Sequence, residues 1–127
     1  MMQQKRKLKY IITPLLICSI LSGCAAISAQ PPAVKITSIK SAAAKGVDYL
    51  KTHQYEKAHE IFNAGLRQDP SNCTLNFLNG LTYHMEGKGG DKSKLNMAEA
   101  AYTLSSNQCK SDPWPHYYLG LVSIDLN

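Results

Sequence analysis

The chain has 127 residues, enough for one domain of ordinary size and too few for a large multidomain enzyme. Hydrophobic residues make up 44% and charged residues 18% of the sequence, a composition typical of packed rather than disordered proteins. The net charge is +5, yet residues 24–127 alone carry 10 basic and 9 acidic residues, a net charge of only +1. A charge balance this close to neutral creates no long-range electrostatic field that would attract a phosphate backbone. The composition therefore excludes a basic nucleic-acid-binding domain.

Residues 1–23 have the pattern of a secretory signal peptide. Four basic residues between positions 5 and 9 precede the apolar run 10–21, which is twelve residues long. A membrane-spanning helix needs about 20 apolar residues, and Pro14 would interrupt this one, whereas the apolar centre of a signal peptide has about 7–15. We therefore expect a targeting segment here and not a transmembrane anchor.

The segment Leu21-Ser22-Gly23-Cys24 resembles the lipobox of bacterial lipoproteins. The resemblance implies that a peptidase cuts before Cys24 and that acyl chains are attached to the thiol and the new amino group of this residue. Each buried methylene of such a chain contributes about 0.8 kcal/mol, so several chains hold a protein on a membrane. Because Ala25 and not Asp follows Cys24, the resemblance also implies an outer-membrane lipoprotein facing the periplasm. The alternative is an ordinary secretory leader with an incidental cysteine.

Residues 24–38 are predicted to form a linker, because adjacent prolines at positions 31 and 32 favour extended backbone. Helical spacing of apolar residues begins at residue 39. Thr37 or Ser38 is expected to cap a first helix that reaches Leu50. A second helix is predicted from Tyr55 to Leu66, and Asp69-Pro70 prevents its continuation.

The two predicted helices resemble a tetratricopeptide repeat, a 34-residue helical hairpin. Gly80 follows Gly46 by 34 residues, and Tyr83 follows Tyr49 by the same interval. The resemblance implies an all-α fold of antiparallel hairpins over residues 39–127, about two and a half repeats. An unrelated helical hairpin is the alternative. The residues of the first repeat at the family's characteristic spacings are Gly46, Tyr49, Tyr55, Ala58, Phe62, Leu66 and Pro70.

The second predicted repeat is longer than the first. Ala98 and Tyr102 lie 40 residues after Ala58 and Phe62, which indicates an insertion of about six residues. The glycine-rich segment 86–91 is expected to form a long flexible turn. The helix before it is predicted from about residue 73 to 85, and the helix after it is predicted to reach about residue 110.

A third repeat begins at Trp114 and is incomplete at Asn127. Tyr118, Leu121 and Ile124 are among several apolar residues near this end that no following helix covers. Since each repeat buries its apolar face against a neighbour, we expect either a longer array or another molecule to cover them.

Cys73 and Cys109 lie at the start and near the end of the second predicted hairpin. The two ends of an antiparallel hairpin are adjacent, and an exported protein is in a compartment that permits oxidation, so we predict a disulfide. Two buried thiols are the alternative.

No catalytic or metal-binding arrangement is recognisable in the sequence. The histidines at positions 53, 59, 84 and 116 are not spaced as paired ligands on one helix turn, and no acidic residue completes a site. No phosphate-binding glycine loop or nucleophile–base pattern stands out either. We therefore expect no metal, no cofactor and no enzymatic activity.

The first helices of successive repeats line a concave groove in the tetratricopeptide family. In this chain the corresponding positions are mostly apolar and aromatic, which favours a protein or peptide ligand. Packing between the helices is the alternative for each residue. The predicted groove residues are Val47, Leu50, Phe77, Leu81, His84, Met85, Trp114, Tyr117 and Leu121.

These patterns together predict a membrane-anchored scaffold or assembly factor for envelope proteins. The resemblance points to lipoproteins that assist pilus, secretion or outer-membrane assembly. The alternatives are a non-catalytic accessory subunit or N-terminal fragment of a cell-wall enzyme, and a protein that associates with itself through the incomplete third repeat.

Overall fold

Five helices follow one another over residues 34–127, the part of the chain that the computed structural model describes, and this part contains no strand. The predicted all-α fold of helical hairpins is confirmed. The described residues all belong to one compact unit, Pro32–Asn127. The helices are α1 (Ile39–Lys51), α2 (Tyr55–Gln68), α3 (Cys73–Gly87), α4 (Lys92–Gln108) and α5 (Pro113–Leu126).

Short polar side chains fix where four of the helices begin. Ser38 caps α1 in a reciprocal capping box with Ser41, so the first of the two predicted caps, Thr37, is not used. Asn72 caps α3, Asp91 caps α4 and Asp112 caps α5, each by accepting backbone N–H bonds of the first turn. These oxygens satisfy donors that a helix N-terminus otherwise leaves unpaired.

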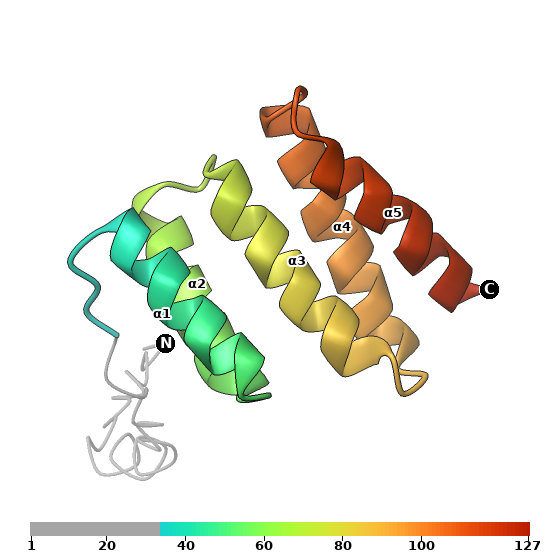
Figure 1. Cartoon of the computed structure of the whole chain (residues 1–127), viewed down its shortest axis with the longest axis horizontal. Helices are drawn as coiled ribbons and strands as arrows, with labels where there is room; N and C mark the ends of the chain where they lie inside the picture. Colours follow the sequence, from blue (N-terminus) through green and yellow to red (C-terminus); the bar gives the residue numbers. More distant parts are fainter. Residues whose placement is uncertain (1–33) are drawn as a thin grey trace, which may run out of the picture. The chain divides into compact units, whose positions relative to one another are not determined.

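Connections of only three or four residues make consecutive helices antiparallel neighbours. Each helix packs against the next one along the chain, and α1 also contacts α3. Figure 1 shows two layers, with α1, α3 and α5 nearer the viewer and α2 and α4 behind them. The first helix of each hairpin therefore lies in one layer and the second helix in the other.

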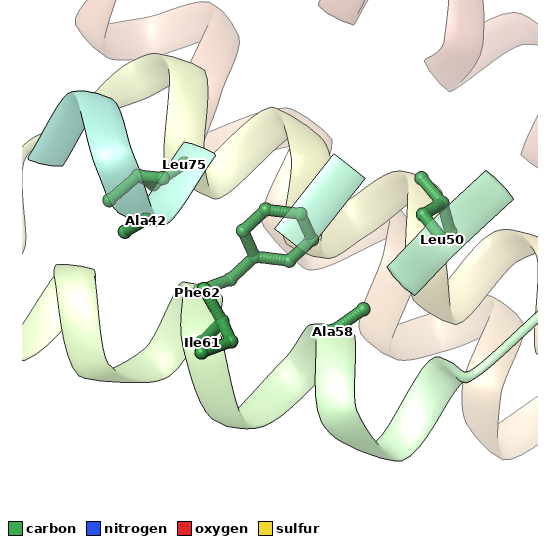
Figure 2. Packing of buried hydrophobic residues seen from close by; sticks show 6 residues of the cluster. All are labelled: Ala42, Leu50, Ala58, Ile61, Phe62 and Leu75. Carbon is green, nitrogen blue, oxygen red and sulfur yellow. The ribbon is translucent and has the colours of Figure 1, made fainter. Parts of the chain in front are cut away.

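The two complete hairpins close at a glycine covered by an aromatic ring. Phe62 on α2 is fully buried, and a Cβ atom built on Gly46 of α1 would overlap its ring. Figure 2 shows this ring pointing from α2 toward α1, between Ala42 and Leu50. Tyr102 on α4 is equally buried and lies 2.9 Å from a Cβ built on Gly80 of α3. The helices approach this closely because glycine leaves room for the ring.

The predicted flexible turn at residues 86–91 is shorter than expected, and that part of the prediction is wrong. Glu86 and Gly87 belong to α3, and Gly87 is buried where a Cβ would contact Leu95 of α4. Relative to the first hairpin, α3 is two residues longer than α1, α4 is three longer than α2, and the loop is one longer. Five of the six inserted residues thus extend packed helices, because helical residues bury more surface than a long loop does.

We expect Gly46→Ala to lower the free energy of unfolding by about 1–3 kcal/mol, because the added methyl group overpacks against the Phe62 ring. The matched control is Gly120→Ala on α5, where nothing lies within 4 Å of the new Cβ. That change should be neutral or stabilise the chain by up to about 1 kcal/mol through helix propensity. Urea unfolding followed by circular dichroism measures both, and equal effects would contradict the packing described above.

Candidate functional site

The nine residues predicted to line a groove fall into three environments. The distinction is the exposed fraction of each side chain, which decides whether a partner can reach it. Leu50 and His84 are buried, whereas Trp114 and Tyr117 are exposed. The remaining five are half-buried: Val47, Phe77, Leu81, Met85 and Leu121.

The assignment of Leu50 and His84 to a binding groove is wrong. Each lies four residues after the glycine of its hairpin, Gly46 or Gly80, and therefore on the same helix face. The second helix of the hairpin covers that face, so Leu50 is 6% and His84 2% exposed.

Most of the half-buried residues pack between helices. The Phe77 ring contacts those of Tyr102 and Tyr118, with centroid distances of 5.7 and 5.3 Å, and so joins α3, α4 and α5. Val47, Leu81 and Met85 pack against the core formed by α1, α2 and the start of α3. For these four residues the alternative of inter-helix packing describes the structure better than a groove does.

An exposed apolar surface remains on α5, and we call it the α5 face: Trp114, Tyr117, Gly120, Leu121 and Ile124. Trp114, Tyr117 and Ile124 are 59%, 57% and 71% exposed. Their spacing of three and seven residues places them on one side of the helix. Ile124 is not among the predicted groove residues; the signal for it in the sequence is that it belongs to the group of apolar residues near Asn127.

The opposite side of α5 packs against the rest of the fold, so the α5 face points away from it. Pro115 and Val122 are fully buried there, and Tyr118, Leu119 and Leu126 pack into the same cluster as Leu95, Ala98 and Tyr102 of α4. A helix that is apolar on all sides is normally buried on all sides. Among the described residues, α5 is covered on one side only.

A partly buried polar contact links α5 to α3 and α4. The Tyr102 hydroxyl and His84 Nδ1 are 3.3 Å apart, and His84 Nε2 lies 2.8 Å from an Asp125 carboxylate oxygen. Burial, and secondarily the neighbouring Tyr118, raises the pKa of Tyr102 well above its ordinary value near 10. The hydroxyl therefore stays protonated and can donate to Nδ1 while Nε2–H donates to Asp125, which joins α4, α3 and α5.

His59 holds a second polar contact, between α2 and α3. Its Nδ1 lies 2.7 Å from Asn79 Oδ1, and its Nε2 lies 2.9 Å from Glu86 Oε2. Lys94 on α4 lies 3.2 Å from the same Glu86 oxygen. No group of three His, Cys, Asp or Glu residues with the geometry of a metal site occurs in residues 34–127. Sequence patterns do not reveal these histidine contacts, because the partners lie 18 to 41 positions away along the chain.

The structure brings Cys73 and Cys109 together at one end of the α3–α4 hairpin. Their Cα atoms are 5.9 Å apart and their sulfur atoms are at bonding distance. Cys24, the predicted lipidation residue, and the predicted signal peptide lie outside the described residues. Within those residues, none of the five helices has the length and apolar character needed to cross a membrane.

Comparison with known proteins identifies no relative: the chain matches no protein family, no curated protein and no solved structure.

We expect Cys73 and Cys109 to be oxidised in the protein purified without reductant, seen as one disulfide and no free thiol at these positions by non-reducing mass spectrometry. The two cysteines are 36 residues apart in the sequence. In the chain-entropy model, Cys73→Ser with Cys109→Ser then lowers the free energy of unfolding by about 4 kcal/mol under oxidising conditions. The same double variant should match the reduced wild-type chain. Two alkylatable thiols in the native protein would contradict the disulfide.

Proposed function

We propose that this chain is a membrane-tethered lipoprotein of the bacterial envelope, of tetratricopeptide type, that binds another protein through the α5 face. The observation that carries the proposal is the exposure of Trp114, Tyr117 and Ile124 on one side of a packed helix. Exposed apolar residues that gather on one surface are typical of sites where another molecule binds.

The chemistry of the α5 face favours a protein partner over a small molecule. Trp and Tyr are enriched where proteins meet, because a rigid ring buries a large area at low entropic cost. The Trp114 and Tyr117 rings stand edge to face with centroids 6.2 Å apart, so each limits the motion of the other. No charged side chain belongs to the face itself, which fits an apolar partner surface.

The rigidity of the hairpins also supports a scaffold role. The aromatic ring over a glycine in each complete hairpin, and the Cys73–Cys109 contact at one hairpin end, resist the splaying of the helices. A surface held on rigid elements loses less conformational entropy on binding.

The anchor at Cys24 completes the proposal. The lipobox-like segment supplies the thiol, and the linker up to residue 38 separates it from the helices. Tethering to a membrane raises the effective concentration of the binding surface for partners on the same membrane.

We expect Tyr117→Ala to reduce partner capture about tenfold or more while leaving the free energy of unfolding within about 0.5 kcal/mol of wild type. Phe77→Ala is the matched aromatic control. Because Phe77 packs between three helices, its loss should lower the free energy of unfolding by about 2–3 kcal/mol.

The measurement combines affinity capture from solubilised envelope with circular dichroism of each purified variant. Capture by Tyr117→Ala that equals capture by wild type would contradict the assignment of the α5 face.

We expect Cys24 to carry lipid when the chain is expressed in a bacterium. Labelling with radioactive palmitate should mark the wild-type chain, and Cys24→Ser should remain unlabelled and fractionate without the membrane. Cys18→Ser is the control, because that cysteine lies within the predicted leader and should leave labelling unchanged. Equal labelling of Cys24→Ser and wild type would rule out this anchor.

A further inference from the structure

Three helix faces within residues 34–127 occupy the same register, and helices of this described part cover only two of them. The second face follows the first by 34 residues, and the third follows the second by 40. All residues of the first two faces are buried, and all residues of the third are exposed. The faces are Ala42, Gly46 and Leu50 on α1, then Asn76, Gly80 and His84 on α3, then His116, Gly120 and Ile124 on α5.

The cover of the first two faces follows one pattern. The second helix of each hairpin brings a fully buried alanine and, four residues later, a fully buried ring: Ala58 with Phe62, and Ala98 with Tyr102. The ring lies over the glycine in both hairpins. At Gly120 the space that such a ring would fill holds no atom within 4 Å of a built Cβ.

We propose that the α5 face receives an amphipathic helix from a partner protein, and that this helix carries an alanine and, four residues later, a phenylalanine whose ring seats over Gly120. The interface would continue the register of the α1–α2 and α3–α4 interfaces by one helix. The inference rests on the proposed function and specifies the partner's chemistry.

The residue four positions after Gly120 favours phenylalanine over tyrosine in the partner helix. Tyr102 keeps its buried hydroxyl bonded to His84, four residues after Gly80. Ile124 occupies the corresponding position on α5, as Leu50 does on α1, and offers no hydrogen-bond partner. A buried tyrosine hydroxyl there would be unsatisfied, whereas a phenylalanine would be packed as Phe62 is.

A second copy of the chain fits this surface less well than a partner protein does. In the described residues, Phe62 and Tyr102 are fully buried within their own hairpins and cannot be donated without opening them. The exposed aromatics of α5 itself, Trp114 and Tyr117, have no alanine four residues before them. The α5 helix of a second copy would therefore not supply an alanine followed four residues later by an aromatic ring.

The probe is a helical peptide with the α2 sequence, residues 55–68, held helical by a staple between positions 56 and 60, both of which are exposed. The peptide should bind the full chain saturably in fluorescence anisotropy. Phe62→Ala in the peptide should weaken binding about tenfold or more, because the ring supplies most of the contact. Lys57→Ala, at an exposed position, is the matched control peptide and should bind as the parent does.

The complementary change lies in the protein. Gly120→Phe places the chain's own ring over the site and should abolish peptide binding without changing helix content, since the position is open. Gly89→Phe is the control, because a Cβ there also meets nothing within 4 Å but lies in the loop between α3 and α4. It should bind the peptide as wild type does.

Three outcomes would overturn the inference: no saturable binding, equal binding of the Phe62→Ala peptide, or a dimer in sedimentation that Tyr117→Arg dissociates. The last would assign the α5 face to a second copy. If the peptide fails while Tyr117→Ala still loses envelope capture, the binding surface stands and only the partner helix is wrong. If capture is also unaffected, the proposed function fails with it.

Discussion

The close approach of two helices at a glycine under an aromatic ring is the contact on which this fold depends. Gly46 with Phe62 and Gly80 with Tyr102 close the two complete hairpins, and each ring is fully buried. Burying one such ring contributes about 1.5–3 kcal/mol, and the contact also fixes which face of the first helix meets the second. The remaining packing follows from that choice, because side chains four residues away on the same face are then buried as well.

This contact decides which of two chemically similar residues is buried and which is exposed. Leu50 and Ile124 are both aliphatic and occupy equivalent positions, yet one is 6% and the other 71% exposed. The difference is that, within residues 34–127, a second helix lies over the first face and none lies over the third. The α5 face is therefore as apolar as a covered helix face, and it is exposed because no helix of residues 34–127 lies against it.

Polar contacts from the buried His84 and Tyr102 to the partly exposed Asp125 hold α5 in place, although only one side of it is covered by the described residues. The chain of contacts from Tyr102 through His84 to Asp125 joins three helices, and no buried side-chain polar atom of the described residues lacks a partner. Satisfied polar networks specify one arrangement of helices over others, because any shift would leave a buried group unpaired. A fixed α5 presents Trp114 and Tyr117 in one geometry, as a binding surface requires.

The helices, their order and their limits to within about two residues can be predicted from sequence patterns, because periodicity, caps and prolines act over a few neighbouring positions. The sequence also identified Cys73 and Cys109 as a pair, since a hairpin brings its two ends together. The packing of the helices was needed to show which apolar residues are accessible, that segment 86–91 is a helix end followed by a short turn, and which residues the histidines contact. Those outcomes depend on contacts between residues far apart in the chain, and the same apolar pattern on one helix is core or surface according to whether another helix lies against it.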